Sequence, residues 1–360
     1  MASYALQTLD NYSVPDDRTS HGQNEQVLRI LYESTRYRTS NNYHFTPQSS
    51  CLGRLNHPDF DEFQGWKDNI KESIRKTKAL RNMVVSGQIE EIQLLKGMNF
   101  ELLTVNNCAV VLGEGTFGVV YLAKDIHTNK LVAIKIFKLI NGLKLSDILK
   151  EVGFQMVTDK QSTLSFTPKI MGLLFFLKSR VPKNCHQCMV AMEYLAVLPK
   201  MGKPMKLSLD DAVQLRLKGK DVLQPIQWES VCKQLIDITM QLSQIKISHL
   251  DLHDSNILFI LEQDRILVNI IDYGKCVWME KTTRLTGFNA NSCLFGKELA
   301  ELQHPLPTSD LYIVSAAILQ ICKMHKWKAS ADVIKQFRKQ AYNNRWHHTE
   351  LAAKLFIKQQ

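Results

Sequence analysis

The sequence predicts an α+β fold in which strands prevail in the first half of the chain and helices in the second. Stretches typical of strands occur between residues 102 and 138 and again between 170 and 195. Apolar residues at helical spacing follow over 207–217 and 228–245, before an apolar strand hairpin over 257–271. With 360 residues, 45% of them apolar, the chain is long enough to bury one large core or two.

The N-terminal part differs from these elements in composition. Residues 1–50 are polar and rich in Ser, Asn, Thr and Tyr, which predicts a segment that is mobile or orders only against a partner. Over 60–96 apolar residues return at helical spacing, with Gly87 as the expected break. Such helices can pack on the strands that follow, either to regulate them or merely to shield them, and their residues do not decide between the two.

A glycine-rich stretch precedes the first long pair of strands. Residues 112–120 read LGEGTFGVV and match the pattern G-x-G-x-x-G-x-V. The glycines alone also fit a flexible loop or the strand-to-helix turn of a dinucleotide-binding fold. Here two strand-like runs, 119–124 and 131–138, follow the glycines, so the glycines lie in a hairpin and open no helix. Because glycine has no side chain, the backbone N–H groups of this loop can approach phosphates closely.

A second group of polar residues flanks the hairpin at 257–271. Residues 249–256 read HLDLHDSN, and the triplet DYG at 272–274 follows the hairpin. The hairpin therefore brings Asp251, Asn256 and Asp272 to one end of the same small sheet. A carboxylate there can orient a hydroxyl nucleophile, and an Asn with an Asp can hold Mg²⁺ on nucleotide phosphates. These side chains predict phosphoryl transfer.

These motifs, in this order, resemble those of the protein kinase family. The family's H-R-D-L-x-x-x-N corresponds to HLDLHDSN, its D-F-G to DYG, and its V-A-I-K occurs unchanged at 132–135. The resemblance implies a bilobal fold, with a small β-rich N-lobe over 99–195 and a larger helical C-lobe over 196–360. Residues 1–98 would form an extension that is partly helical and partly disordered. The resemblance also implies ATP and Mg²⁺ as cofactors and a protein substrate as partner.

The resemblance also implies a role for individual residues. Lys135 would contact the α- and β-phosphates of ATP and would need a carboxylate partner, for which Glu151 on the next helical stretch is favoured over Asp147 one turn earlier. Asp251 would be the catalytic acid–base residue. The implied magnesium ligands are Asn256 and Asp272. The remaining nucleotide-binding positions belong to the glycine loop, the roof over the adenine and the strand that enters the hinge between lobes: Gly113, Glu114, Gly115, Thr116, Gly118, Val120, Ala133, Met192, Glu193 and Leu195.

One departure from the family leaves the acceptor open. Serine/threonine kinases usually carry a lysine two residues after the catalytic Asp, where it neutralises the transferring phosphate, whereas this chain has His253. H-x-D-L-H is similar to the loop of aminoglycoside and choline kinases and of a few divergent protein kinases. The chain can therefore be a Ser/Thr-type protein kinase, a small-molecule kinase on the same fold, or a pseudokinase scaffold. The glycine loop and V-A-I-K favour transfer to a Ser/Thr hydroxyl of a protein, with His253 in the place of the lysine.

A second departure concerns regulation. In most regulated protein kinases the residue before the catalytic Asp is an arginine, whose buried charge is costly until a phosphate on the activation segment pairs with it. Here that residue is Leu250, which carries no charge. The sequence therefore predicts activity without phosphorylation of the activation segment. The threonines that would otherwise be candidates for phosphorylation are Thr282, Thr283 and Thr286.

Composition bounds the partners and the compartment. The net charge is +10 and basic residues gather after residue 323, but no RNA-binding aromatic signature or zinc finger accompanies them, so we expect no specific nucleic-acid binding.

No apolar run approaches the ~18 residues that span a bilayer, and residues 1–16 lack the pattern of a signal peptide. Eight scattered cysteines are typical of reduced thiols, and CHQC at 185–188 is expected to form a turn, because no second pair completes a zinc site. We expect an intracellular protein, cytoplasmic or nuclear.

Overall fold

The computed structural model places most of the chain after residue 60. The described residues are 60–88, 100–105, 108–139, 142–175, 184–195, 199–200, 203–206, 208–220, 223–262, 265–279 and 308–340, together with 351, 354 and 355. They divide into two compact units, one of 60–157 and 168–206 and the other of 158–167 and everything from 208 onward. The polar segment 1–50 and the helical pattern over 89–96 lie outside the described residues. The predicted lobe boundary at 195/196 stays a prediction.

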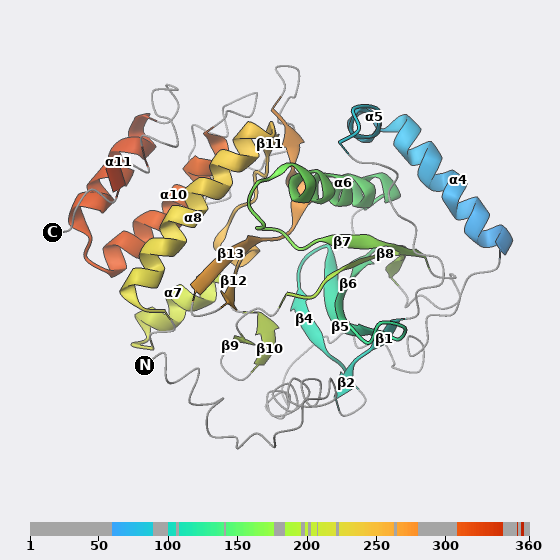
Figure 1. Ribbon diagram of the computed structural model, residues 1–360, viewed down its shortest axis with the longest axis horizontal. Coiled ribbons are helices and arrows are strands. Elements are labelled where there is room, and N and C mark those ends of the chain that lie inside the picture. Colours follow the sequence, from blue (N-terminus) through green and yellow to red (C-terminus); the bar gives the residue numbers. More distant parts are fainter. Residues whose placement is uncertain are drawn as a thin grey trace. The chain divides into compact units, whose positions relative to one another are not determined.

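The first unit is built on one antiparallel sheet, drawn in blue-green to green in Figure 1. Its strands run in the order β1-β5-β6-β8-β7, and β4 pairs with the free part of β5. Their bounds are β1 Phe100–Leu102, β4 Val111–Glu114, β5 Gly118–Asp125, β6 Leu131–Lys138, β7 Ile170–Phe175 and β8 Cys185–Glu193. Two short hairpins add β2 Thr104–Val105 with β3 Cys108–Ala109, and β9 Pro199–Lys200 with β10 Lys203–Lys206.

The alternation of side chains gives this sheet two different faces. Tyr121 lies opposite Ile134, which lies opposite Ala191, and directly opposed residues point to the same face. This face carries the apolar core cluster of the sheet. The alternate residues, which include Lys135, lie on the other face. The strand pattern of β5 and β6 thus sends one lysine out of an otherwise apolar run to the face opposite the core.

Helix α6, Leu145–Gln161, carries the predicted partner of that lysine. Ile148, Leu149 and Val152 are buried, at the spacing of one helical face. The helix begins with a side-chain cap, because a carboxylate oxygen of Asp147 accepts a hydrogen bond from the backbone N–H of Lys144 at 2.9 Å. The last turn of α6, from residue 158, belongs to the second unit.

Two helices of the N-terminal extension pack on the β-rich unit. Helix α4 covers Phe60–Lys76 and helix α5 covers Lys78–Val85. Trp66 of α4 is 5% exposed and stacks on Phe175 of β7, with ring centroids 4.7 Å apart. The expected break at Gly87 is present, since Gly87 has φ +68° after the end of α5. A further break at Thr77 was not expected; this β-branched residue adopts an extended conformation between the two helices.

The second unit is mainly helical. It contains α7 Leu209–Leu217, α8 Pro225–Gln244, α10 Ser309–Met324 and α11 Lys328–Gln340. Pro225 occupies the first position of α8, where its missing N–H costs nothing, and Trp228, Leu235 and Leu242 on the same helix are fully buried. The small strands are β11 Ile247–Ser248 with β14 Val277–Trp278, and β12 Ile257–Glu262 with β13 Arg265–Ile270. Two 3₁₀ turns, η2 Asp254–Asn256 and η3 Tyr273–Lys275, flank the β12–β13 hairpin.

One local prediction is wrong. Residues 185–188 form no turn but the first part of strand β8, where Cys185 and Cys188 are buried. Burial raises the pKa of the Cys185 thiol to about 11, and the ring Nδ1 of His186 accepts a hydrogen bond from the backbone N–H of Cys188 at 3.0 Å. Pairing with β6 and β7 outweighs the local turn pattern. Nowhere in the described part of the chain do three or more His, Cys, Asp or Glu side chains gather to hold a metal ion.

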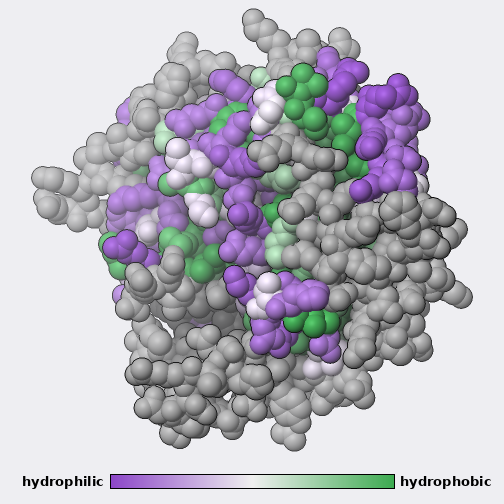
Figure 2. All heavy atoms as spheres, turned by 45° about the vertical axis from the view of Figure 1, so that its right-hand side comes forward, coloured by the Kyte–Doolittle hydropathy of each residue, from purple (hydrophilic) through white to green (hydrophobic). Residues whose placement is uncertain are grey.

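The coloured part of the face in Figure 2 is mostly hydrophilic. Figure 2 shows hydrophilic residues over much of the coloured face, with smaller hydrophobic areas between them. Large apolar side chains that are more than half exposed, such as Val85, Leu217 and Ile226, come from different elements. Single exposed apolar residues are normal for folded proteins. Within the described ranges, no helix is both long enough and apolar enough to cross a bilayer.

Candidate active site

The glycine loop joins β4 to β5, and its three glycines differ in what they permit. A Cβ on Gly118 would lie 2.6 Å from the carbonyl oxygen of Ile136, so only glycine fits against β6 at this position. A Cβ on Gly113 or Gly115 would meet nothing within 4 Å. Thr116 at the tip of the loop is exposed. Gly118 is therefore needed for packing, whereas the other two glycines leave open space beside the backbone.

A lysine that the sequence did not single out holds this loop. Lys138, the last residue of β6, donates from Nζ to Oε1 of Glu114 at 2.7 Å and to the carbonyl oxygen of Gly115 at 3.2 Å. The loop is also closed by the N–H of Gly115, which donates to the carbonyl oxygen of Gly118 at 2.9 Å. The backbone of the glycine loop is thus positioned by contacts within its own unit.

Lys135 of β6 forms an ion pair with Glu151 of α6. Its Nζ donates to Oε1 of Glu151, and the two side chains are only 12% and 11% exposed. Asp147, the competing acid, caps the start of α6 instead. The structure therefore pairs Lys135 with the favoured carboxylate.

The residues predicted to surround the adenine lie on the same face of the sheet as Lys135. Val120 lies directly opposite Lys135, and Ala133, two residues before Lys135, lies opposite Met192. Ala133 and Met192 are buried, at 4% and 9% exposure. An apolar patch thus continues along one face of the sheet from the lysine to the end of β8.

The predicted hinge residues follow at the end of that strand. Glu193 is the last residue of β8, and its N–H donates to the carbonyl oxygen of Lys169 at 2.9 Å. Leu195 lies two residues beyond the strand and is half-buried. The N–H of Glu193 is therefore used within the unit, and a bound adenine would have to use other backbone groups of this segment. Their role stays a prediction.

In the helical unit the catalytic loop gathers around Asp251. The side-chain nitrogen of Asn256 donates to the carbonyl oxygen of Asp251 at 2.9 Å and lies 3.4 Å from its Oδ2. Nζ of Lys275 donates to Oδ1 of Asp251 at 2.7 Å. The carboxylate of Asp251 is 11% exposed. Asp251 and Asn256 are thus brought together, and Lys275, which the sequence had offered only as a possible partner of an activation-segment phosphate, joins them.

Asp272 follows directly on the segment that ties the hairpin to the catalytic loop. The N–H of Ile271 donates to the carbonyl oxygen of Asn256 at 3.1 Å, and Asp272 then begins the turn η3 with φ 69°. Because the amide nitrogen of Asn256 is used toward Asp251, its amide oxygen is the atom that remains for a ligand. An amide oxygen and a carboxylate are hard oxygen donors of the kind that Mg²⁺ prefers, so these residues fit the metal that the motif implies.

His253 has a structural task in the catalytic loop. Its Nδ1 accepts a hydrogen bond from the N–H of Ser255 at 3.3 Å and so caps η2. Its Nε2 lies 3.9 Å from Oδ2 of Asp251. The predicted contact of His253 with a phosphate stays a prediction.

Asp310, in the first turn of α10, holds the backbone of the catalytic loop. Its Oδ2 accepts from the N–H of His249 at 2.7 Å and from the hydroxyl of Ser248 at 3.3 Å, and its Oδ1 accepts from the N–H of Leu250 at 2.8 Å. Leu250 is fully buried and has φ 61°, a conformation that a bulky residue adopts only when its surroundings enforce it. Burial raises the pKa of the Asp310 carboxyl to about 6 against the effect of these donors.

The imidazole of His249 is fully buried and packs on Tyr273. The two ring centroids lie 4.8 Å apart in an edge-on arrangement. Burial lowers the pKa of His249 to about 4, which keeps its ring neutral at physiological pH. This aromatic contact joins the start of the HLDLHDSN loop to the DYG turn within the helical unit.

The protein kinase domain model matches residues 107–358, well over half of the chain. The chain belongs to the protein kinase family. Its β-rich and helical units thus confirm the predicted α+β kinase fold. Protein kinase domains in general use ATP and Mg²⁺.

Individual relatives of this kinase chain match it over a shorter stretch. Serine/threonine-protein kinase 10 of Danio rerio is 27% identical over 171 residues, which are 48% of this chain and 15% of that protein. Serine/threonine-protein kinase SULU of Caenorhabditis elegans is 27% identical over 179 residues, 49% of this chain and 15% of that protein. Serine/threonine-protein kinase 10-A of Xenopus laevis is 26% identical over 163 residues, 45% and 14% of the two proteins. The matched stretch is thus a small part of each relative's length.

The sequence did not predict the contacts that three residues make in the kinase site, namely Lys138, Lys275 and Asp310. Asp310 follows Ser309 at the start of α10, and such a pair is a signal for a helix cap and not for a contact with a distant loop. Lys138 stands in no pattern, and Lys275 directly follows the DYG triplet, a position that by itself does not predict a contact with Asp251. The threonines of the activation segment lie outside the described residues, so the structure says nothing of them.

Proposed function

We propose that this kinase transfers the γ-phosphoryl group of ATP, with Mg²⁺, to a serine or threonine hydroxyl of a protein substrate. The observation that carries the proposal is the Lys135–Glu151 ion pair, formed with both side chains nearly buried. Phosphoryl transfer by protein kinases requires this pair to be in place. Desolvating two charges is costly. Catalysis gives a reason for keeping this pair that a scaffold which only binds partners does not need.

Each residue then has a defined task. Lys135 neutralises charge on the phosphates of the nucleotide, and Glu151 holds the lysine in position. Asp251 orients the acceptor hydroxyl and accepts its proton while the new oxygen–phosphorus bond forms and the bond to the leaving ADP breaks. Asn256 holds the backbone of Asp251 through its hydrogen bond to the Asp251 carbonyl oxygen and, with Asp272, offers oxygen atoms to the metal. Bound Mg²⁺ supplies positive charge that stabilises the transferring phosphoryl oxygens.

The choice of a protein acceptor rests on two observations. The glycine loop and V-A-I-K are those of protein kinases, and the similar proteins carry serine/threonine-protein kinase in their names. The histidine at position 253, which small-molecule kinases share, is the observation that favours the second candidate, a kinase acting on a small hydroxylated molecule.

The test supplies labelled ATP to the purified chain, once with a mixed protein extract and once with a panel of small-molecule acceptors. We expect label in protein serine or threonine, and a loss of at least about 10³-fold in turnover for Asp251→Asn. Nucleotide affinity should change little in this variant. Glu229→Gln, which alters a partly exposed carboxylate paired with Lys233 in the same unit, is the matched control and should keep full activity.

Two results would overturn the proposal. Label found only in small molecules would assign the chain to the second candidate. Transfer that is equal in the wild type and in Asp251→Asn would remove the catalytic role and leave a nucleotide-binding scaffold.

A further inference from the structure

Lys275 lies beside the catalytic carboxylate and is partly open to solvent. Its Nζ is 2.7 Å from Oδ1 of Asp251, yet its own side chain is 49% exposed while that of Asp251 is 11% exposed. An ammonium group has three hydrogen-bond donors. One of them is used by Asp251, so the exposed side of the group has donors left for an anion.

The backbone around Lys275 fixes where this lysine starts. It ends the turn η3, which is closed by a hydrogen bond from the N–H of Cys276 to the carbonyl oxygen of Tyr273 at 3.2 Å. Tyr273 and Cys276 are both fully buried and hold the turn on either side of the lysine. Asp272, assigned above to the metal, precedes the same turn. Lys275 therefore lies in a hydrogen-bonded turn whose neighbouring side chains are buried.

His253, which occupies the family's usual lysine position, lies farther from the carboxylate of Asp251 than Lys275 does. Nδ1 of His253 accepts the hydrogen bond from the N–H of Ser255. Its Nε2 is 3.9 Å from Oδ2 of Asp251, whereas Nζ of Lys275 is 2.7 Å from Oδ1. Among the residues that the structure describes, Lys275 is the lysine or arginine that pairs with Asp251.

We propose that Lys275 is a catalytic residue of this kinase, whose ammonium group contacts Asp251 and the γ-phosphate of ATP together. In serine/threonine kinases this positive charge usually comes from a lysine of the catalytic loop. Here it comes from the residue directly after DYG. This inference rests on the proposed function. As the acceptor oxygen attacks, the negative charge on the transferring phosphoryl oxygens is met by Lys275, while Asp251 receives the hydroxyl proton. The lysine keeps its own protons throughout.

The first experiment compares Lys275→Met with the wild type in the full chain. Only ATP carries a γ-phosphate, so we expect the affinity for Mg²⁺-ATP, measured by titration calorimetry, to fall about fivefold while that for Mg²⁺-ADP changes less than about twofold. Turnover should fall by about 10- to 100-fold with a smaller change in KM. Lys335→Met removes an exposed lysine of α11 that pairs with Asp332 and serves as the matched control, with no expected change in any of these quantities.

The second experiment is a rescue. His253→Lys added to Lys275→Met returns a lysine to the other side of Asp251, and we expect it to restore turnover to within about threefold of the wild type. A purely structural role of Lys275 would not be rescued in this way. Melting temperatures of all variants should agree closely with that of the wild type, because the Lys275 side chain is half exposed and its loss leaves no cavity.

Either of two results overturns the inference. Unchanged turnover and an unchanged preference for ATP over ADP in Lys275→Met would show that the lysine meets no phosphate. A rise in turnover would show that Lys275 obstructs Asp251 in the wild type. If wild type and Asp251→Asn transfer no phosphate to any acceptor, the proposed function fails, and the comparison of ATP with ADP affinity still decides whether Lys275 contacts the γ-phosphate.

Discussion

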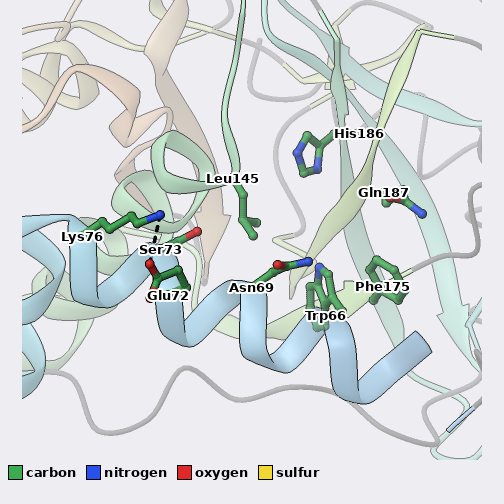
Figure 3. A pocket seen from close by; sticks show the side chains of 9 residues that line it. All are labelled: Trp66, Asn69, Glu72, Ser73, Lys76, Leu145, Phe175, His186 and Gln187. Carbon is green, nitrogen blue, oxygen red and sulfur yellow. Dashed lines mark ion pairs between the residues drawn. The ribbon is translucent and has the colours of Figure 1, made fainter. Parts of the chain in front are cut away.

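Replacing Trp66 by alanine should release the α4–α5 helix pair from the β-rich unit. The Trp66 side chain is 5% exposed and stacks on Phe175 at 4.7 Å with an interplanar angle of 29°. Figure 3 shows the two rings facing each other at the border of a cavity of about 410 Å³ between α4, the start of α6 and the strands β7 and β8. The tryptophan is thus an aromatic contact of α4 with the sheet at this cavity.

The cavity decides the magnitude. Removing a buried tryptophan side chain costs about 3–5 kcal/mol, and an aromatic pair contributes about 0.5–1.5 kcal/mol of that beyond its buried area. Because Trp66 already borders open space, its loss enlarges an existing cavity and does not create a sealed one. We therefore expect the low end, a fall of about 3 kcal/mol in the free energy of opening of the α4–α5 pair.

Hydrogen exchange measures this opening directly. A loss of about 3 kcal/mol should accelerate the exchange of the backbone amides over residues 60–85 by about 10²-fold, while those of α8 and α10 in the other unit keep their rates. Trp66→Phe keeps the stacked ring and is the matched control, with an expected loss of about 1 kcal/mol. Acceleration of less than about fivefold in Trp66→Ala would refute the reasoning. Turnover of the same variant decides whether the helices regulate the kinase or merely shield its sheet.

Two further predictions concern the catalytic loop. Burial raises the pKa of Asp310 to about 6, above its unfolded value, so this group stabilises the fold below about pH 4 and loses that contribution as the pH rises through about 6. Urea titrations measure the unfolding free energy of the wild type and of Asp310→Asn. The difference, wild type minus variant, should fall by up to about 3 kcal/mol between pH 4 and pH 7. A difference that stays constant or rises would contradict this prediction. Leu250 carries no charge for a phosphate to neutralise, so phosphatase-treated protein whose residues 275–297 are unmodified by mass spectrometry should keep its turnover within about tenfold. A larger loss would show that another cation pairs with a phosphate there.

The sequence by itself determined the elements whose signal is local. Strand β6 occupies 131–138 as predicted, because it is a nearly continuous apolar run that contains β-branched residues. The glycine loop and the HLDLHDSN loop were found because each packs its functional residues into one short stretch with fixed spacing. Asp251 and Asn256 are close for the same reason, since they are only five positions apart in the chain.

Only the tertiary structure decided the contacts between distant parts of the chain. The local pattern of CHQC predicted a turn, but pairing with two neighbouring strands made it part of β8. Glu151 and Asp147 lie one turn apart on one helix, and the choice of Glu151 for Lys135 depends on how α6 sits on the sheet and on the use of Asp147 as a helix cap.

The clearest examples of such long-range contacts are the hydrogen bonds of Asp310 to the catalytic loop and the ion pair of Lys275 with Asp251. Some sixty residues separate Asp310 from the two N–H groups that it accepts from, and twenty-four separate Lys275 from Asp251. The motifs place Asp251 and Asp272 at one site but assign no contact to Lys275 or Asp310, because the packing of α10 and η3 against the loop sets these distances. Hydrophobic burial chooses that packing, and the polar contacts that complete the site follow from it.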